Sequence, residues 1–306
     1  MYIGIDLGGH TISAAAVSFD KGRAVVSDRI TARTPVSRNL DETTELIASL
    51  IRELYSRSNA LSVGIAVPAF LDRERFFITK FTNFSALEDI KLPELVRAKL
   101  LSCGIDIPVY MENDANCAAL GEGMCGAAQG LSDYIVLTLG TGVGSGIVVN
   151  GKLLTGAHGM AGEAGHIIAG QEKPCPCGGF AHLEGAFSAD VLEGLAAEKG
   201  IAGDFRELWE KREFEEAKAI LVPALDALGR GIATMYALFD PELIVLSGGM
   251  SRAEGLYNEL VPCVERYISA PYRKYLNIKI SELTSDAAVT GAASAAAKNT
   301  EKGSCL

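Results

Sequence analysis

The sequence predicts an α/β protein with two similar lobes, and three observations support this prediction. Short apolar segments with strand character alternate with amphipathic segments of helical period along the chain. Two glycine-rich turns, Gly8-Gly9 and Gly140-Thr141-Gly142, each join segments that are typical of paired strands. At 306 residues the chain is long enough to bury two hydrophobic cores.

The chain begins with a predicted hairpin. An apolar strand over residues 2–6 enters the first glycine turn, and a second strand over residues 12–17 returns from it. Backbone N–H groups of such a turn can cradle a phosphate, and Asp6 at the strand end can hold a water on Mg²⁺. Glycine hairpins are common, so an ordinary turn remains an alternative on these residues alone. The candidate nucleotide-binding residues here are Asp6, Gly8, Gly9 and Thr11.

A helix and a buried strand follow. Helical spacing covers residues 41–58, with Asp41 placed to cap the helix. Near-continuous apolar character then predicts a buried strand over residues 61–67. This strand ends at Pro68-Ala69-Phe70, a loop of the kind that lines clefts in α/β folds, and Asn83 lies in the irregular segment beyond it.

A group of polar residues closes another short strand, predicted over residues 109–111. Glu112-Asn113-Asp114 stands between this strand and a predicted helix over residues 115–122. Asn or Asp just before an apolar helical run most often serves as the N-cap, so Asn113 or Asp114 can have that role. The alternative is that Asp114 is a general base at a strand end, directed into a cleft.

The second half of the chain repeats the hairpin pattern. A strand from Tyr134 leads into the second glycine turn, where Thr141 adds a hydroxyl to the bare amides of Gly140 and Gly142. Asn150-Gly151 then predicts a hairpin turn. Two such turns suggest two similar lobes that face each other.

Helices and one more strand complete the second half. Helices are predicted over residues 204–220 and 221–239, and a strand over residues 243–246. That strand ends in Gly248 and Gly249 before a helix, a pattern typical of a nucleotide-approach turn. A small-residue helix over residues 287–297 would allow tight packing, back onto the first lobe.

The segment Gly159–Gly185 concentrates metal-binding residue types, with two of the four histidines and two of the seven cysteines of the chain. Glycines let this loop turn back, and Pro176 stiffens the turn between the cysteines. Two thiolates and two imidazoles would neutralise a zinc dication and leave no ligand position open, which predicts a structural zinc site. The alternative is two reduced cysteines in an ordinary turn. The four candidate ligands are His166, Cys175, Cys177 and His182.

Two carboxylates lie next to the candidate ligands. Glu163 precedes His166 by three residues, and Glu184 follows His182 by two. Carboxylates held in this way suit sugar hydroxyls, whose protons they accept in hydrogen bonds. The alternative is that both are solvated surface acids.

The composition argues against several function classes. The chain is 48% hydrophobic and 22% charged, as in ordinary globular proteins, and its net charge of −10 with a pI near 5.0 disfavours nucleic-acid and membrane-surface binding. No apolar run is long enough to span a bilayer, and the N-terminus lacks signal-peptide character. The other five cysteines show no framework spacing, which favours free thiols in a reducing cytoplasm, although one chance disulfide stays open.

With these residues assembled, the chain resembles the ROK family of sugar kinases from Asp6 to about Ala297. The glutamate-glycine-histidine element followed by a Cys-x-Cys-Gly loop is specific to that family, whereas the glycine turns are shared with the actin-like ATPase superfamily. The matching motifs are Asp6-Leu7-Gly8-Gly9, Glu112-Asn113-Asp114, Gly140-Thr141-Gly142, Gly162-Glu163-Ala164-Gly165-His166, Cys175-Pro176-Cys177-Gly178 and Leu183-Glu184.

The resemblance implies a two-lobed α/β fold of the actin-like ATPase (ribonuclease H-like) type with a small zinc loop. We expect the first lobe to span residues 1–114, completed by the C-terminal helix at about 287–306. The second lobe is then expected over residues 115–286, with the zinc loop at 166–182. Members of the family are often dimers, so the resemblance further implies a homodimer. The acidic charge leads us to expect no nucleic-acid or membrane partner, and the scattered cysteines lead us to expect a cytoplasmic location.

The implied activity is ATP-dependent, Mg²⁺-assisted phosphorylation of a hexose, at the 6-hydroxyl of glucose or a close relative such as allose. Asp114 matches the catalytic base of the family, which takes the proton of the attacking hydroxyl. His166 matches both a sugar contact and a zinc ligand. The expected sugar-binding residues are Asn83, Asn113, Asp114, Glu163, His166 and Glu184.

The chain departs from the family pattern at several positions. His10 replaces the threonine that usually follows the first Gly-Gly pair. Ala69 and Phe70 replace the last two residues of a Pro-Gly-Pro sugar loop, which makes a bulkier wall. The Pro68-Ala69 pair resembles allose kinases more than typical glucokinases. His182 stands where the family has a third cysteine, and Ala181 replaces the glycine before it.

Two other functions are weighed against a kinase. Some ROK proteins are sugar-responsive repressors with an N-terminal helix-turn-helix, but here the first predicted strand starts at Tyr2 and leaves no room for that domain. The other is a catalytically silent protein that binds or senses sugar. Asp114 and both glycine turns argue against it, whereas His10 in the first turn keeps it open.

Overall fold

The computed structural model divides the chain into two compact units. It describes residues 1–20, 23–37, 39–75, 77–81, 88–170, 173–175, 177–283 and 286–303. The first unit comprises residues 1–130, 153–161 and 285–306, and the second 131–152 and 162–284. This division differs from the expected boundary after residue 114, because the helix that begins at Asp114 packs inside the first unit.

The first unit is built on a five-stranded sheet in the order β3-β2-β1-β4-β7. β1 pairs with β2 in an antiparallel hairpin, while β1, β4 and β7 run parallel. The short strands β5 and β6 form a separate hairpin. The strands are β1 (Tyr2–Leu7), β2 (Thr11–Asp20), β3 (Arg23–Arg33), β4 (Val63–Val67), β5 (Ala69–Leu71), β6 (Ile78–Phe81) and β7 (Val109–Asn113).

The second unit repeats this arrangement with the strand order β10-β9-β8-β11-β12. Again the first strand pairs antiparallel with the second and parallel with the fourth, and the fifth lies parallel at the edge. The prediction of two similar lobes is therefore confirmed at the level of topology. The strands are β8 (Tyr134–Leu139), β9 (Val143–Val149), β10 (Lys152–Leu153), β11 (Leu243–Ser247) and β12 (Ile278–Ile280). Asn150 and Gly151, both with positive φ, make the predicted turn between β9 and β10.

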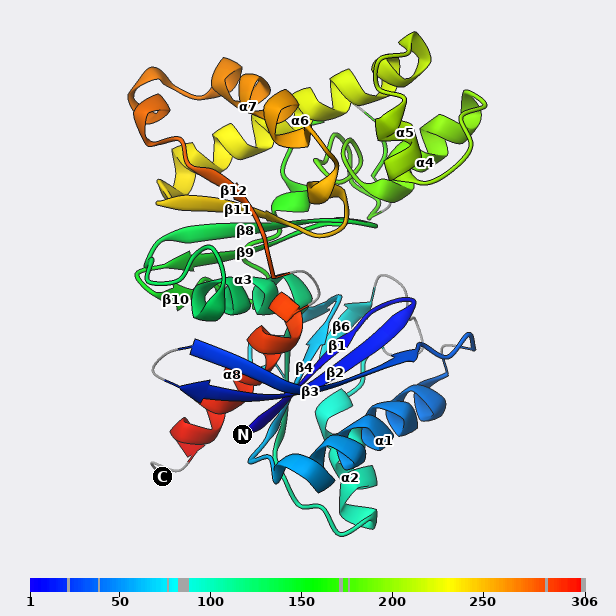
Figure 1. Cartoon of the computed structure of the whole chain (residues 1–306), viewed down its shortest axis with the longest axis vertical. Helices are drawn as coiled ribbons and strands as arrows, with labels where there is room; N and C mark the ends of the chain where they lie inside the picture. Colours follow the sequence, from blue (N-terminus) through cyan, green and yellow to red (C-terminus); the bar gives the residue numbers. More distant parts are fainter. Residues whose placement is uncertain are drawn as a thin grey trace. The chain divides into compact units, whose positions relative to one another are not determined.

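Helices α1 (Leu40–Ser58) and α2 (Leu92–Ser102) lie together beside the first sheet (Figure 1). Their apolar side chains enter one core with those of the strands. The cap of α1 is Asn39 and not the expected Asp41, because the Asn39 side chain accepts the backbone N–H of Asp41 at 2.8 Å. Asp41 is instead free to pair with α2.

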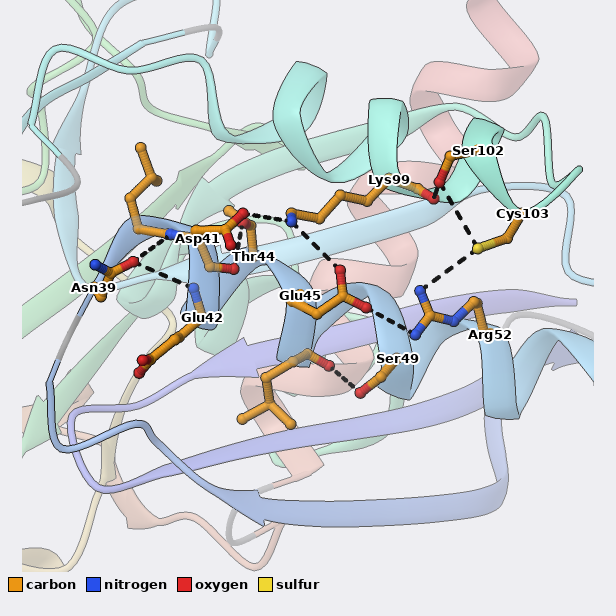
Figure 2. Close-up of polar contacts among 12 residues, drawn as sticks. Asn39, Asp41, Glu42, Thr44, Glu45, Ser49, Arg52, Lys99, Ser102 and Cys103 are labelled. Atoms are coloured by element: carbon orange, nitrogen blue, oxygen red, sulfur yellow. Dashed lines mark hydrogen bonds and ion pairs between the residues drawn. The ribbon is translucent and has the colours of Figure 1, made fainter.

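Charged side chains bridge α1 and α2 outside this core (Figure 2). Lys99 Nζ lies 2.7 Å from Asp41 and 3.4 Å from Glu45, and Arg52 reaches the same Glu45 at 2.9 Å. Exposed pairs of this kind contribute little to stability, because solvent screens them. The seam is therefore held mainly by its buried apolar residues, and the charges fix its alignment.

The helices of the second unit correct the predicted pattern. The helix expected over residues 204–220 is two helices, because Trp209 is anchored in the core by a hydrogen bond to Glu254 O and the chain turns at 211–214. The helix expected directly after Gly248-Gly249 is only a 3₁₀ turn. The helices are η2 (Ala164–His166), α4 (Ala189–Glu198), α5 (Phe205–Glu210), α6 (Glu215–Phe239), η3 (Met250–Arg252), α7 (Leu256–Tyr267) and η4 (Ala270–Tyr275).

Two general features concern the whole described chain. No helix in the ranges given above combines the length and apolarity that crossing a bilayer requires. The cysteines among these residues are all free thiols, namely Cys103, Cys117, Cys125, Cys175, Cys177 and Cys263.

Helix α8 (Asp286–Gly303) packs against α3 (Asp114–Cys125) and the first sheet with its backbone in direct contact. A Cβ built on Gly4 of β1 would overlap the carbonyl oxygen of Val289. A Cβ on Gly64 of β4 would overlap the carbonyl of Ala292 in the same way. No side chain can therefore stand between α8 and these two strands.

We expect Gly64→Ala to destabilise the protein by about 3 kcal/mol or more, because the new methyl group meets a rigid backbone carbonyl. The matched control is Gly194→Ala in α4, where a Cβ meets no atom within 4 Å. A helical glycine in open space should gain up to about 1 kcal/mol on replacement by alanine. Urea unfolding of both variants measures the difference, and equal midpoints would contradict the backbone contact.

Candidate active site and metal loop

Acidic side chains gather where the parallel strands of the first unit end. In the sheet register Asp6 of β1 lies beside Ala66 of β4, and Ala66 lies beside Glu112 of β7. Asp114 is the first residue of α3, immediately after β7. The carboxyl ends of parallel strands are the usual place for ligand-binding groups in α/β folds.

The two aspartates of this group have strongly shifted acidities. Burial raises the pKa of Asp6 to about 7, and the negative charge of Asp114 adds to the increase. Burial likewise raises the pKa of Asp114 to about 6, although two backbone N–H groups at the start of α3 oppose the change. Both residues are half-buried as a whole. A carboxylate with this acidity is suited to exchange a proton near neutral pH.

The structure decides between the two candidates for the N-cap of α3. Asn113 Oδ1 accepts the backbone N–H of Asn116 at 3.0 Å, so Asn113 is the cap. Its amide group also donates to Ala69 O at 3.3 Å, which ties the loop after β4 to the end of β7. Asp114 is therefore not needed as the cap, and its carboxyl group is available for chemistry.

An ion pair that the sequence did not reveal supports the acidic residues at the end of β7. Glu112 and Arg75 are both almost fully buried, with 3.0 Å between Arg75 Nε and Glu112 Oε1. Arg75 also donates to the carbonyl oxygens of Asp72 and Gly159. Glu112 in turn accepts from the Asn113 backbone N–H and the Asn116 amide. Arg75 stands 37 residues from Glu112 in the chain, in a segment with no regular pattern, so only the fold brings them together.

The first glycine turn is fixed by a residue that the sequence also left unnoticed. Thr34 donates its hydroxyl to Gly8 O at 2.7 Å and its backbone N–H to His10 O at 3.0 Å. Gly8 N–H closes the turn on Thr11 O at 3.0 Å. His10, which departs from the family pattern, is exposed at the tip of the turn. Asn83 lies outside the described residues.

The second unit has two glycine-rich turns, one at residues 140–142 after β8 and one at residues 248–249 after β11, and they lie next to each other. These strands are parallel neighbours, with Ser247 beside Thr138 in the register. Gly248 has φ of 88°, and a Cβ there would overlap Leu139 O, the residue just before the turn at Gly140. The structure therefore brings Gly140, Thr141 and Gly142 next to Gly248 and Gly249.

The two carboxylates predicted to bind sugar, Glu184 and Glu163, lie close to candidate metal ligands, and Glu184 also contacts the start of β9. Glu184 Oε2 accepts the backbone N–H of Val143 at 3.0 Å, and its Oε1 lies 4.0 Å from Cys175 Sγ. Glu163 Oε2 lies 4.0 Å from His166 Nε2. Both carboxylates belong to the second unit and are partly exposed.

The four predicted zinc ligands come together. His166, Cys175, Cys177 and His182 each offer a donor atom, and all four donor atoms lie within 4.8 Å of one another. Cys177 Sγ and His182 Nδ1 are 3.1 Å apart. Two sulfur and two imidazole donors in such a cluster fit a tetrahedral zinc ion, whose bonds are about 2.0–2.3 Å long. His182 thus lies where a ligand is needed.

Backbone hydrogen bonds hold this loop in shape. Cys175 N–H donates to Gly179 O at 2.8 Å, and Gly178 N–H donates back to Cys175 O at 2.8 Å. Ala181 adopts a left-handed conformation with φ of 57°, which explains why a glycine suits this position in the family motif. Pro176 lies outside the described residues.

The pH dependence of stability should report the burial of Asp6. Its folded-state pKa of about 7 lies above the usual value of 3.8, so the folded protein holds this proton more tightly than the unfolded chain. The resulting stabilisation is complete below about pH 4 and is lost as the pH rises through 7. Between pH 5 and pH 8 the wild type should lose about 2–3 kcal/mol that Asp6→Asn does not lose.

Urea unfolding at both pH values, without nucleotide or Mg²⁺, measures this effect. Asp20→Asn, at the exposed end of the neighbouring strand β2, is the matched control and should behave like the wild type. If Asp6→Asn and the wild type have parallel pH profiles, Asp6 is not held neutral by burial.

Metal analysis should find about one zinc per chain in protein purified without a histidine tag. Cys177→Ala should lower this content well below one, because it removes a sulfur donor, whereas Cys263→Ala on α7 should leave it unchanged. Zinc that stays substoichiometric after refolding with excess metal would contradict a structural site.

Comparison with known proteins places these features in a family. The sequence model of the ROK family matches residues 2–299. The glucokinase of Thermotoga maritima is 32% identical over an alignment of 311 positions, which covers 95% of this chain and 96% of that protein. The crystal structure of a ROK hexokinase from Thermus thermophilus superposes with a TM-score of 0.83 at 29% identity and covers 98% of this chain and 99% of that one.

Further relatives include both a liganded enzyme and a regulator. A ROK family glucokinase from Streptomyces griseus, solved in complex with glucose and AMPPNP, has a TM-score of 0.79 at 27% identity and covers 97% of this chain and 99% of that one. The xylose repressor of Caldicellulosiruptor bescii is 29% identical over an alignment of 313 positions, which covers 94% of this chain and 76% of that protein. The chain belongs to the ROK family and has its actin-like, two-lobed α/β fold.

Proposed function

We propose that this chain is an ATP-dependent hexose kinase that phosphorylates the 6-hydroxyl of glucose or a close relative such as allose. The observation that supports this most directly is Asp114, a carboxylate with a pKa of about 6 at the end of a parallel strand. The glucokinase and hexokinase relatives, which match nearly the whole chain, support the same class of reaction.

In this mechanism Asp114 is the general base. Phosphoryl transfer asks the protein mainly to position the reactants and to orient the nucleophile. With a pKa of about 6, Asp114 is ionised at neutral pH but binds a proton more strongly than an ordinary carboxylate does. It accepts the proton of the sugar hydroxyl as that oxygen attacks the γ-phosphorus of ATP, while the bond from this phosphorus to the bridging oxygen breaks and ADP leaves. The Asn113 cap keeps Asp114 in place at the start of α3.

The hydroxyl groups of the sugar are bound by the polar side chains that the family resemblance indicated. Asn113 contributes an amide, Glu163 and Glu184 contribute carboxylates that accept hydroxyl protons, and His166 contributes an imidazole next to Glu163. Asn83 belongs to the same proposal on the strength of the family resemblance alone. The zinc bound by His166 and its three partners would hold the loop that carries these groups.

The nucleotide is bound by the glycine turns. Backbone amides of Gly8 and Gly9 with Thr11, and those of the turn at residues 140–142, bind phosphate oxygens, and Gly248 and Gly249 approach the nucleotide. Mg²⁺ would neutralise charge on the transferred phosphate, with Asp6 holding one of its waters. A nearby cation would favour the ionised form of Asp6, whose pKa burial raises to about 7.

The alternative is a catalytically silent, sugar-sensing protein, and the xylose repressor among the relatives keeps this candidate in view. The two functions differ in what they bind and release. A kinase binds both sugar and nucleotide and releases ADP, whereas a sensor needs only the sugar. Isothermal titration with glucose and with AMPPNP separates them.

The experiment that tests the proposed function is an ADP-release assay with ATP and Mg²⁺ against a panel of sugars. Glucose, allose, mannose, fructose, N-acetylglucosamine and N-acetylmannosamine cover the relevant hydroxyl patterns. One strong responder establishes the kinase and identifies its substrate, and a preference for allose would agree with the Pro68-Ala69 pair. No turnover by folded, zinc-loaded protein would contradict it.

We expect Asp114→Asn to lower kcat by at least about 100-fold while sugar still binds, because the amide cannot accept the proton. In the wild type, kcat should fall as the pH drops through about 6, where Asp114 becomes protonated. The matched control is Asp106→Asn, on an exposed aspartate paired with Arg97. Activity above about 1% in Asp114→Asn, or an acidic limb near pH 4, would mean that another group is the base.

A further inference from the structure

The glycine turn at residues 140–142 depends on a side chain from outside the β8–β9 hairpin. Gly140 N–H closes the turn on Gly142 O at 3.0 Å, and Gly140 O accepts the N–H of Ala189 at 2.8 Å. The next amide, that of Val143, points to Glu184 Oε2 at 3.0 Å. The strand β9 begins at this residue, so Glu184 holds the point where the turn enters the strand.

The carboxylate of Glu184 also occupies the space beside Gly142. A Cβ built on Gly142 would overlap Glu184 Oε2, and no other neighbour comes closer than the carboxylate carbon. Gly142 therefore has no side chain because Glu184 lies there, and its φ is not in the left-handed region. A side chain at this position would have to displace the Glu184 carboxylate from the Val143 amide.

Glu184 is itself held by the same elements. Its backbone N–H donates to Gly165 O at 2.8 Å, and a Cβ on Gly165 would overlap Val143 O. The two backbone polar groups of Val143 therefore have different neighbours. Its N–H donates to the Glu184 side chain, and its carbonyl oxygen lies against Gly165. On the other side, Glu184 Oε1 lies 4.0 Å from Cys175 Sγ of the metal loop.

We propose that Glu184 is a positioning residue for nucleotide binding, which holds the phosphate turn at residues 140–142 through the Val143 amide. This inference rests on the proposed function and adds to it, because Glu184 there is only a sugar contact. Its two oxygens have separate roles: Oε2 orders the turn, while Oε1 remains for a sugar hydroxyl. Glu184 thereby joins the metal loop, the sugar-binding group and the nucleotide turn within one unit.

The role depends on the length of the side chain and on an acceptor oxygen, and not on negative charge. Glu184→Gln keeps both the length and an oxygen that can accept the Val143 N–H. Glu184→Asp keeps the charge but is one methylene shorter, so its carboxylate cannot reach Val143 from the same backbone position. A role that requires the charge would give the opposite order of these two variants.

The test is titration of AMPPNP with Mg²⁺, in the absence of sugar, against the zinc-loaded full chain. We expect Glu184→Asp and Glu184→Ala to raise the Kd for AMPPNP by about tenfold or more, because the amide at the base of the turn loses its acceptor. Glu184→Gln should stay within about threefold of the wild type. Glu163→Ala, which changes the other predicted sugar-binding carboxylate of the same unit, should leave this Kd unchanged.

Zinc content and circular dichroism of each variant show whether the metal loop and the fold are intact. If Glu184→Ala does not fold, the Gln and Asp pair still decides the question. A wild-type Kd for AMPPNP in Glu184→Asp, with loss of glucose binding alone, would overturn the inference and leave the proposed kinase standing. Absence of AMPPNP binding by the wild type would instead contradict the proposed function and, with it, this inference.

Discussion

The structure of the first unit depends on backbone contact between helix α8 and the central strands. Gly4 and Gly64 leave no side chain between β1, β4 and the carbonyl groups of α8, and Gly291 of α8 lies equally close to Cys117 O of α3. A small displacement of α8 would disrupt such contacts, so close packing fixes α8 against β1, β4 and α3. Asp6 ends β1 and Asp114 begins α3, so the last helix of the chain fixes both carboxylates from the opposite end of the sequence.

The site carries an electrostatic cost that the rest of the unit has to offset. Two carboxylates with raised pKa values lie close enough for the charge of one to affect the other. At pH 8 both are ionised in an environment that disfavours charge, whereas a bound cation and substrate would relieve the repulsion. The buried Arg75 supplies positive charge to Glu112 and not to these aspartates, so Glu112 is satisfied structurally while Asp6 and Asp114 stay available.

Sequence patterns predicted those features that depend on local chemistry. The glycine turns, the Asn150-Gly151 hairpin and the Cys-x-Cys loop each follow from residue types at short spacing, and the structure confirms their placement. The family resemblance supplied the actin-like fold, which the comparisons confirm. The roles of Asp114 and the sugar-binding residues stay predictions, because they concern ligands and chemistry that neither pattern nor fold determines.

Features that depend on long-range packing were not predicted from the sequence. The Glu112–Arg75 pair and the Thr34 anchor join segments 37 and 26 residues apart, where no periodic signal exists. The break between α5 and α6 follows from the burial of Trp209 against Glu254 O, which an amphipathic pattern over residues 204–220 could not show. Asp41 looked like a cap because it is an acid at a helix start, but Asn39 has the geometry and Asp41 pairs with Lys99 of α2.

The repeated sheet topology shows how one arrangement of strands can divide two tasks. In both units a hairpin leads the sheet and a parallel strand lies beside its first strand. In the first unit the parallel strands end in groups suited to proton transfer and hydroxyl binding, with Asp114 after β7. In the second unit β11, which corresponds to β4, is followed by Gly248, which approaches Leu139 O so closely that only a bare backbone fits. Acids need desolvation to act as bases near neutral pH, whereas phosphate groups need exposed amides without side chains. The same topology therefore carries half-buried acidic residues at the ends of β1 and β7 in the first unit and a bare backbone at Gly248 after β11 in the second.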